Sequence, residues 1–458
     1  MLDDGAPPRF FSAAPGDGRR IAVVSHTHPS VSKGGAEIAA YALFRGLRKL
    51  GADALFVAGC DEKDRGRLHL GGADERILFH EPERYEHFYQ LGAPAVAREL
   101  AALLAAERVG VANFHHYLFL GLAALRAAKL AAGAVTVATL HEYLAICHHH
   151  GQMVTRPARA LCERASPESC GECFPEMDRT QFALRRDRFL SAFGAVDRFV
   201  SPSRFLADRH VAWGLEPDRI EVIENGLAGF NGAAPRRPRA PGAPWVFGYF
   251  GQINQFKGVD VLLRACDLLA ERKDMAGRVQ IRVHGNLVGQ APAFVERFEK
   301  AARDYPFLSY AGPYSNSMVR ELMAACDYVV VPSTWWENSP LVIQEAFAAR
   351  CPVVCSGIGG MAEKVEDKAT GLHFRPGDAA DLLRAFAAAM HEATHAAFIE
   401  RLPVPDNEVG MARRYLECFG AAVRGGAAER SAPLPPAAAP PAPETHRTPK
   451  PRKRKVPC

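Results

Sequence analysis

Short continuous apolar runs alternate along the chain with segments in which apolar residues recur at helical spacing. A continuous run predicts a strand buried on both faces, as in a parallel sheet, whereas a 3.6-residue period predicts an amphipathic helix. In the first half, strands are predicted at 21–24, 55–57, 111–114, 135–140 and 199–200, and helices at 36–50, 95–107, 120–130 and 203–211. Such alternation is typical of an α/β domain with a parallel sheet.

A second series of the same kind follows the proline-rich stretch 236–244, which we interpret as a linker. Its strands are predicted at 245–249, 279–283, 328–331 and 353–354, and its helices at 259–271, 318–325 and 341–349. The sequence therefore predicts an α/β protein of two doubly wound, Rossmann-like domains that face a cleft.

The two series define the predicted domain boundaries. Residues 147–180 interrupt the first series with cysteine, histidine, proline and charged residues, and we interpret them as an insertion. The predicted parts are a loose leader at 1–19, an N-terminal domain at 20–225, a C-terminal domain at 226–400, a C-terminal helix returning towards the first domain at 401–420, and a disordered Pro/Ala-rich basic tail at 421–458.

The charge of the chain is concentrated in that tail. The 458 residues carry a formal net charge of +5, and the tail holds eight basic and two acidic residues, so the body is nearly neutral. A neutral body gives no basis for specific nucleic-acid binding. The basic end predicts weak contact with an anionic membrane, contact with nucleic acid, a nuclear signal or a merely solubilising segment. Neither a secretion signal nor a long uncharged apolar run is present, which predicts a cytoplasmic protein, peripheral to a membrane if the tail binds lipid.

The richest candidate site is the segment 332–345, which follows a predicted strand. Ser339 is a suitable N-cap and Pro340 suits a first helical turn, so a helix is predicted to begin near residue 340. Free N–H groups at such a helix start bind phosphates at the edge of an α/β sheet. Glu337 and Glu345 flank this start and would accept hydrogen bonds from ligand hydroxyls. Alternatively, both are solvated glutamates.

Three further segments follow predicted strands and carry candidate ligand-binding groups. Lys257 follows the turn at Gly251 and could neutralise a diphosphate, unless it is a plain surface lysine. Gly34-Gly35 leads into a helix and permits close approach of a ligand, although a simple tight turn would have the same sequence. His141 ends a buried strand, either facing the cleft or serving as a structural histidine.

Together these segments resemble family 4 of the retaining nucleotide-sugar glycosyltransferases, which have the GT-B fold. The resemblance covers roughly residues 20–420 and is strongest over 247–377. The matching residues are Gly34-Gly35-Ala36-Glu37, His141, Ser201-Pro202-Ser203, Glu224-Asn225-Gly226, Gly251 with Lys257-Gly258, the pair Glu337 and Glu345, and, downstream, Gly357, Gly359-Gly360, Glu363 and Gly371-Leu372.

The resemblance implies a reaction and roles for these residues. A sugar would pass from a UDP- or GDP-linked donor to a hydroxyl of a glycan or lipid-linked acceptor on the N-terminal domain, with retention of anomeric configuration, as in cell-surface polysaccharide biosynthesis. The implied catalytic residues are Glu337, Lys257 and His141, and the implied donor-binding residues are Gly34, Gly35, Gly251, Gln252, Ser339, Pro340, Leu341 and Glu345. The chain contains no Asp-x-Asp motif, which agrees with catalysis that requires no metal cofactor.

One position departs from the family pattern. An arginine usually follows the glycine at 251, but this chain has Gln252, so one of two cations is missing. A weakened or specialised enzyme would fit this change, and so would a non-catalytic, partner-binding scaffold on the same fold. A nucleotide-sugar epimerase or a phosphorylase is a further alternative.

Four cysteines fall within the insertion. Cys147, Cys162, Cys170 and Cys173 include one C-x2-C pair, and four thiolates form a closed, structural zinc site. Such a metal would supply folding energy to a segment of low apolar content. His148 to His150 could replace one ligand. The alternatives are four reduced thiols without metal and an iron–sulfur cluster, which the ligand type also allows. We predict a structural zinc, in an insertion that shapes acceptor choice.

Overall fold

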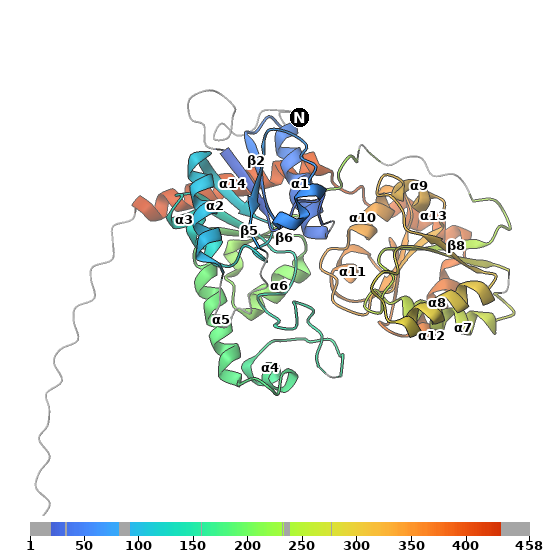
Figure 1. Cartoon of the computed structure of the whole chain (residues 1–458). Helices are drawn as coiled ribbons and strands as arrows, with labels where there is room; N and C mark the ends of the chain where they lie inside the picture. The colour runs from blue at the N-terminus through green and yellow to red at the C-terminus, as the bar shows by residue number, and fades with distance from the viewer. Residues whose placement is uncertain are drawn as a thin grey trace, which may run out of the picture.

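The structure is a computed structural model that describes residues 20–32, 34–81, 92–156, 158–230, 232, 239–275 and 277–431. The predicted leader and most of the tail lie outside these residues. Figure 1 shows two α/β domains side by side, each built on one twisted sheet with helices on both faces. The predicted pair of Rossmann-like domains is therefore confirmed.

The first domain is built on a seven-stranded parallel sheet with the order β3-β2-β1-β4-β5-β6-β7. The chain passes from the centre to one edge and then crosses back to the other, as in a doubly wound sheet. The strands are β1 Arg20–Ser25, β2 Ala54–Cys60, β3 Glu75–Phe79, β4 Val109–Phe114, β5 Val135–Thr139, β6 Arg198–Ser201 and β7 Ile220–Val222. Strands β2, β4 and β5 are buried at every position, which explains their continuous apolar runs.

Helices from both ends of the chain cover this sheet. They are α1 Gly35–Lys49, α2 Pro94–Ala106, α3 Ala123–Leu130, α5 Arg179–Phe193, α6 Arg204–Trp213 and α14 Glu408–Ser431, with 3-10 turns at Glu62–Arg67 and Pro217–Arg219. Helix α14 returns from the second domain and lies against α1 (Figure 1). The contact is close, since a Cβ on Gly46 of α1 would meet the Glu408 carbonyl at 2.0 Å. Because α14 extends to Ser431, the prediction of disorder from residue 421 is wrong for 421–431.

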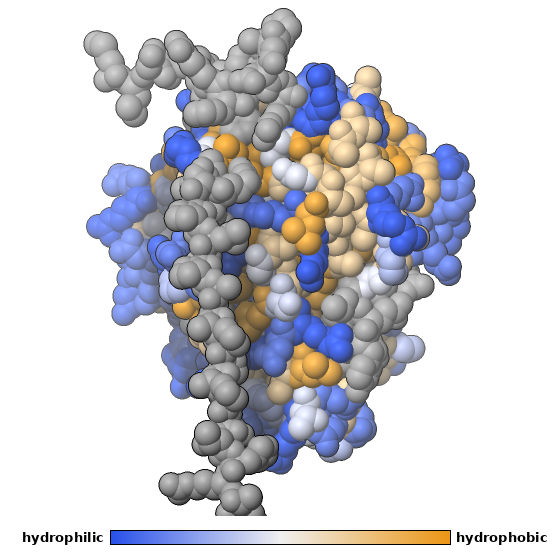
Figure 2. All heavy atoms as spheres, turned by 90° about the vertical axis from the view of Figure 1, so that its left-hand side faces the viewer, coloured by the Kyte–Doolittle hydropathy of each residue, from blue (hydrophilic) through white to orange (hydrophobic). Residues whose placement is uncertain are grey.

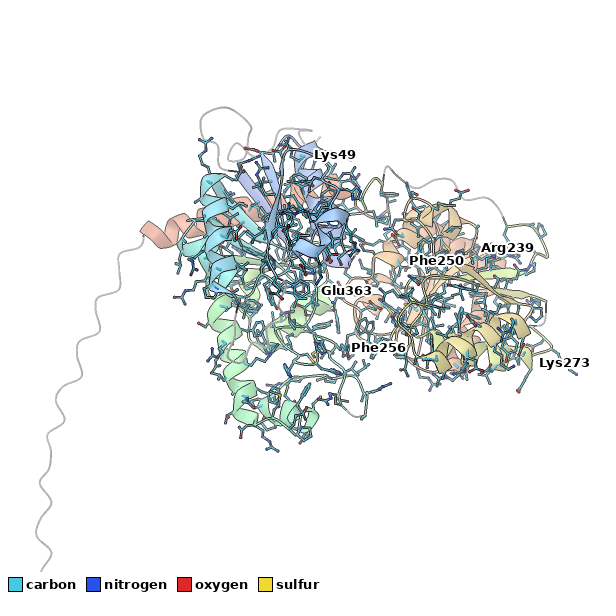
Figure 3. The ribbon with its side chains drawn as sticks, viewed as in Figure 1. Lys49, Arg239, Phe250, Phe256, Lys273 and Glu363 are labelled. Carbon is cyan, nitrogen blue, oxygen red and sulfur yellow. The ribbon has the colours of Figure 1, made fainter. Side chains whose placement is uncertain are left out.

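The second domain has a six-stranded parallel sheet with the order β10-β9-β8-β11-β12-β13. Its strands are β8 Trp245–Phe250, β9 Val279–His284, β10 Leu308–Gly312, β11 Tyr328–Val331, β12 Val353–Ser356 and β13 Gly371–Phe374. Its helices are α7 Val259–Ala270, α8 Pro292–Asp304, α9 Val319–Ala324, α10 Leu341–Ala348, α11 Gly359–Lys364, α12 Ala379–Ala389 and α13 Glu392–Arg401. Arg239, within the predicted linker, stacks its guanidinium on Trp245 of this domain (Figure 3).

Side chains of the second domain fix it to the first. Trp336 joins the hydrophobic core of the first domain and packs on Phe205. The carboxylate of Glu363 accepts hydrogen bonds from the backbone N–H groups of Arg204 (2.8 Å) and Phe205 (2.7 Å), at the start of α6. In Figure 3, Glu363 lies between the two domains. A carboxylate at this position satisfies free N–H groups of a helix N-terminus across the domain boundary.

The insertion lies at one end of the first domain, below the sheet in Figure 1. It contains the short helix α4 Pro167–Cys173 and a small core around Phe174 and Phe182. The face of the first domain in Figure 2 mixes hydrophilic and hydrophobic residues. Within the described ranges, each helix is too short or too polar to cross a membrane.

Candidate active site

A cavity of about 420 Å³ lies between the two domains, at the carboxyl ends of both sheets. From the first domain, His26 follows β1, His116 follows β4 and His141 follows β5. The residues that line it are His26, Gly35, Ala36, Glu37, His116, His141, Glu142, Pro202 and Asn225 of the first domain, and Lys257, Glu337, Asn338, Ser339, Pro340 and Leu341 of the second. This crevice is where doubly wound domains bind their ligands.

Lys257 and Glu337 form an ion pair on the second-domain wall. The Lys257 Nζ lies 2.7 Å from Glu337 Oε1. Burial alone would raise the pKa of Glu337, but the Lys257 ammonium, together with hydrogen bonds from Lys257, Trp335 Nε1 (2.8 Å) and Ser333 Oγ (2.7 Å), lowers it below its ordinary value. Glu337 is therefore a fixed carboxylate, and it holds a cation at the cavity wall.

The turn that carries Lys257 depends on a glycine. Gly258 has a φ of +74°, and a Cβ there would meet the carbonyl oxygen of Pro332 at 1.7 Å. Only glycine fits this left-handed position so close to another backbone segment. The turn thus presses the residues before α7 against the segment after β11 and brings Lys257 to Glu337.

Helix α10 begins at the cavity, as predicted, but with a different cap. Its first residue is Leu341 and its N-cap is Pro340, with no side-chain capping bond. The prediction of Ser339 as the N-cap is wrong, because the chain is still extended at Pro340. The Ser339 hydroxyl and the Asn338 amide oxygen are buried without a hydrogen-bond partner in the described protein. Both residues line the cavity, so these polar atoms are available to a ligand.

His141 is held as a neutral imidazole. Its Nε2 lies 3.0 Å from Nδ1 of His115, a bond in which one ring donates and the other accepts. Burial, with a smaller effect from His26, lowers the pKa of His141 to about 3. The Asn338 amide donates to the His141 carbonyl at 2.7 Å, which ties the second domain to this strand end. His141 therefore offers hydrogen bonds to a ligand without a positive charge.

Glu37 and His26 form a second polar pair on the first-domain wall. His26 Nε2 lies 3.5 Å from Glu37 Oε1, and Thr27 Oγ1 lies 3.3 Å from the same oxygen. The Glu37 carboxylate folds back over Gly34, where a Cβ would meet its Oε2 at 2.4 Å. His26 is 8% exposed, and its Nδ1 has no partner in the described protein.

The structure gathers some predicted site residues at the cavity and places others away from its lining. Gly35, His141, Lys257, Glu337, Ser339, Pro340 and Leu341 line it, whereas Gly34, Gly251, Gln252 and Glu345 do not. Gln252 is exposed and its amide oxygen lies 3.4 Å from the Asn254 amide. Glu345 lies within α10, where burial raises its pKa to about 7.

Sequence reasoning did not select several lining residues as site residues. Four of them, His26, His116, Glu142 and Asn338, are not among the residues that match the family pattern. The other four, Ala36, Glu37, Pro202 and Asn225, belong to motifs that match the family pattern but had no assigned site role. His26 and His116 each follow a buried strand by one or two residues. A search for the polar residues that follow each predicted strand would have identified His26 and His116.

The insertion also reaches the second domain. Trp336 Nε1 donates to the Cys162 carbonyl at 3.1 Å, and the Arg159 guanidinium donates to Gln255 Oε1 at 3.0 Å. A second cavity of about 390 Å³ lies between the insertion and Phe256, which is labelled in Figure 3. The insertion thus contacts the second domain at Gln255 and Trp336. None of its described residues lines the cavity between the domains, so its predicted place beside the acceptor stays a prediction.

The four cysteines of the insertion form no disulfide bond with one another. Cys147 is buried, and Cys162, Cys170 and Cys173 are partly buried. Burial, together with the nearby Cys162 and Cys173, raises the pKa of Cys170 to about 11. Across the described ranges, His, Cys, Asp and Glu side chains form no group of three or more arranged to hold a metal ion. The structure therefore does not support the zinc site, which stays a prediction.

Two family models match successive parts of the chain. Residues 33–228 match the family described as "Glycosyltransferase Family 4", and residues 244–392 match the one described as "Glycosyl transferases group 1". The boundary between the matches falls at the linker between the two sheets. The chain is thus similar to glycosyltransferases in both domains.

Curated relatives and solved structures agree with these matches. The D-inositol 3-phosphate glycosyltransferases of Stackebrandtia nassauensis and Kribbella flavida are 31% and 30% identical over 36% and 42% of this chain. The chain covers less than half of these relatives, 40% and 49% of their lengths.

The Anabaena protein HepE in complex with UDP has a TM-score of 0.63 at 19% identity, over 88% of this chain and 100% of that one. Sucrose-phosphate synthase from Thermosynechococcus elongatus has a TM-score of 0.61 at 17% identity, over 90% and 98%. These two structures share the fold.

Proposed function

We propose that this protein is a retaining glycosyltransferase that moves a sugar from a nucleoside diphosphate sugar to an acceptor hydroxyl. One observation carries the proposal: an interdomain cavity in which the Lys257–Glu337 pair and the start of α10 face His141 across the cleft. A cation beside free helix N–H groups suits a diphosphate. The opposite wall, rich in hydrogen-bonding groups and without a lysine or arginine among its described lining residues, suits hydroxyls.

The donor would bind along the second domain. Its diphosphate would lie at the first turn of α10, against the N–H groups after Pro340, with Lys257 beside it. A Cβ added to Gly35 would meet no atom within 4 Å, so this residue would leave room for the diphosphate on the first-domain side. Glu345 would accept hydrogen bonds from ribose hydroxyls. The UDP complex of HepE, which shares this fold, supports UDP as the nucleotide.

The reaction breaks the bond between the anomeric carbon and the diphosphate oxygen and forms one to an acceptor oxygen. Negative charge develops on the departing diphosphate, where Lys257 and the helix N–H groups stabilise it. The acceptor oxygen attacks the anomeric carbon on the face from which the diphosphate departs, so the anomeric configuration is retained. The acceptor proton passes to the departing diphosphate. Because Lys257 is a fixed cation, this proposal requires no metal cofactor. Glu337 keeps Lys257 in place, and neutral His141 would bind a hydroxyl of the donor sugar.

Gln252 does not argue for a non-catalytic scaffold in this arrangement. Its exposed side chain is not part of the cavity lining, whereas Lys257 and Glu337 are paired at the wall. A scaffold or an epimerase has no specific support from the cavity. A role in cell-surface glycan synthesis rests on the resemblance alone.

Nucleotide binding followed by transfer tests the proposal. Purified protein is heated with UDP, GDP, ADP and UDP-glucose, since ligand binding to the native state raises the melting temperature. We expect a rise with UDP or GDP and a smaller rise in a Glu345→Gln variant. Release of the nucleotide from its sugar is then followed with and without acceptors. A folded protein whose melting temperature responds to no nucleotide would contradict the proposal, and sugar modification that needs no acceptor would favour an epimerase.

A further inference from the structure

The second cavity, between the insertion and the second domain, differs in charge from the interdomain cavity. Its volume is about 390 Å³, and no carboxylate is among its described lining residues. The lining includes His149, Gln152, Thr155, Arg156 and Arg159 of the insertion and Phe256 of the second domain. The interdomain cavity, by contrast, has the carboxyl groups of Glu37, Glu142 and Glu337 in its lining. A cavity of this size is typical of small-ligand sites, and its two guanidinium groups favour a negatively charged ligand.

A short hairpin of the insertion carries Arg159 to the second cavity. An antiparallel bridge joins Val154 to Leu161 at its base. Arg159 has a φ of +53°, a left-handed conformation that is uncommon for residues with a side chain. Its N–H donates to the Thr155 carbonyl at 3.0 Å, which holds this strained residue in the hairpin. The Arg159 guanidinium donates to an uncharged amide, Gln255 Oε1, at 3.0 Å, so this contact leaves its positive charge unneutralised.

Arg156 is oriented by its neighbours but keeps donors for a ligand. Its guanidinium carbon lies 4.6 Å from the centre of the Phe174 ring, and one of its nitrogens donates to Glu176 Oε1 at 3.0 Å. The two side chains of this ion pair are 44% and 56% exposed, and an exposed pair of this kind is weak. Since a guanidinium has five N–H groups, Arg156 can bind a ligand oxyanion while it stays on Phe174.

Phe256 and Gln152 offer contacts that suit a sugar ring. Phe256 is partly buried and stacks on Trp335, with the ring centres 5.4 Å apart. An aromatic ring at a cavity wall packs against apolar C–H groups, which sugar rings present on their faces. Gln152 is partly buried, and its amide oxygen has no hydrogen-bond partner in the described protein. Such an amide can turn to bind a ligand hydroxyl through its oxygen or its nitrogen. A bare inorganic anion would use neither group.

We infer that the second cavity binds a sugar that carries an oxyanion, either a carboxylate or a phosphate. Arg156 and Arg159 would bind the oxyanion, Gln152 would bind a hydroxyl of the sugar, and Phe256 would pack on the face of its ring. The inference goes beyond the proposed function, because binding in this cavity requires neither a nucleotide nor sugar transfer.

Trp335 connects the second cavity to the candidate active site. One contact of its ring is the stacked Phe256, and another is the Lys257 ammonium, 5.5 Å from the ring centre. Its Nε1 donates to Glu337 at 2.8 Å. A sugar packed on Phe256 would therefore touch the wall that holds the Lys257–Glu337 pair.

Titrations with small sugars test the inference. The probes are methyl glucuronide, glucose 6-phosphate, the neutral methyl glucoside and inorganic phosphate, each titrated into the full chain by ligand-observed NMR. We expect one or both acidic sugars to bind at least about tenfold more tightly than methyl glucoside, because charge-assisted hydrogen bonds are stronger than neutral ones. They should also bind more tightly than inorganic phosphate. Binding of only one acidic sugar would identify its oxyanion as the one that the cavity takes.

Three results of these titrations would overturn the inference. They are equal binding of the neutral and the acidic sugars, binding of inorganic phosphate as tight as that of both acidic sugars, and no binding of either acidic sugar to the folded protein.

Substitutions test whether the sugar binds in this cavity. Arg156→Gln and Arg159→Gln each remove one cation from an exposed side chain, and we expect each to raise the Kd of the acidic sugar about tenfold. Glu176→Gln should lower this Kd, because Arg156 would no longer share its guanidinium with a carboxylate. Arg164→Gln changes an exposed arginine of the insertion outside the cavity lining, and this matched control should leave the Kd unchanged.

A further variant separates the charge of Arg159 from its contact with the second domain. Gln255→Ala removes the acceptor of the Arg159 hydrogen bond but keeps the cation, so the Kd should stay close to the wild-type value. If Gln255→Ala weakened binding as much as Arg159→Gln, or if both arginine variants kept the wild-type Kd, the inference would be wrong. The melting temperature of each variant verifies its fold. Since no nucleotide is present, these results do not depend on the proposed function.

Discussion

The Lys257 ammonium lies 2.7 Å from a carboxylate oxygen of Glu337, across 80 residues of sequence. The pair joins the turn before α7 to the segment before α10, the two parts of the second domain that border the cavity. Glu337 also accepts hydrogen bonds from Ser333 and Trp335, so its position does not depend on Lys257 alone. A cation oriented in this way before the reaction begins stabilises a departing diphosphate without further reorganisation.

Removal of Lys257 should therefore abolish transfer and also destabilise the fold. Lys257→Met leaves the buried Glu337 carboxylate without its cation, and we expect a loss of about 1–3 kcal/mol in the free energy of unfolding. Urea unfolding measures the stability, and nucleotide release measures the activity. Adding Glu337→Gln to Lys257→Met should restore part of the stability but none of the activity.

The exposed Lys273 provides the control for that experiment (Figure 3). Lys273→Met should alter neither stability nor transfer. If Lys257→Met retained wild-type transfer, the assigned role of the ammonium would be wrong. If the double variant were less stable than the single one, the ion pair would not account for the stability loss.

Glu345 should make donor binding depend on pH. Burial raises its pKa to about 7, but only the ionised carboxylate accepts hydrogen bonds from both ribose hydroxyls. Affinity for UDP-glucose, whose diphosphate does not titrate in this range, should rise between pH 5.5 and 8. Calorimetry at several pH values measures it, and Glu345→Gln should remove the dependence. An equal slope in the variant would contradict this role.

The same carboxyl should affect stability in the opposite direction. The folded protein keeps a proton on Glu345 that the unfolded chain loses near the ordinary glutamate pKa of 4.5. The stability supplied by this group is thus present below about pH 4.5 and is lost as pH rises through about 7. In the absence of ligand, Glu345→Gln should gain stability relative to the wild type between pH 5 and pH 8. A constant difference over this range would show that Glu345 titrates normally.

Glu363 should hold the two domains together. Glu363→Ala removes both hydrogen bonds to the start of α6, and loss of such a cap costs about 1 kcal/mol. We expect a lower melting temperature and a larger radius of gyration in solution scattering, because the domains would separate more often. Glu366→Ala, an exposed carboxylate nearby, is the control. Unchanged scattering and stability in Glu363→Ala would contradict the cross-domain contact.

Metal analysis of the purified protein tests whether the insertion binds zinc. If Cys147, Cys162, Cys170 and Cys173 bind zinc, the purified protein should contain equimolar metal and Cys170→Ser should lose it. Cys60→Ala, which changes a cysteine far from the insertion in sequence, should retain the metal. Metal-free wild-type protein with a cooperative melting transition would show four reduced thiols instead.

The alternation of apolar runs and helical patterns was sufficient to predict both sheets but not their full extent. The central strands β2, β4 and β5 are buried throughout and show as continuous runs. Strands β3, β7, β10 and β13 were missed, and all lie at sheet edges. In β10, for example, Ser309 and Tyr310 are exposed, so the sequence lacks a continuous apolar run there.

The site was predictable residue by residue but not as a set of contacts. Lys257 and Glu337 each follow a predicted strand, so each could be selected, but their ion pair depends on the turn at Gly258. His116 and Glu142 come from neighbouring strand ends of the first domain. Their approach depends on the parallel pairing of β4 with β5, which local sequence does not determine.

The fate of the anomeric carbon tests the central claim most directly. Protein, UDP-glucose labelled with ¹³C at that carbon, and a panel of sugar acceptors are followed together by NMR. We predict that the donor signal is replaced by that of an α-linked product as UDP is released, and that Lys257→Met stops both changes. A β-linked product would contradict retention. If the donor signal stays unchanged with folded wild-type protein and every acceptor, and a GDP-linked sugar also gives no change, the proposal that this protein is a glycosyltransferase is wrong.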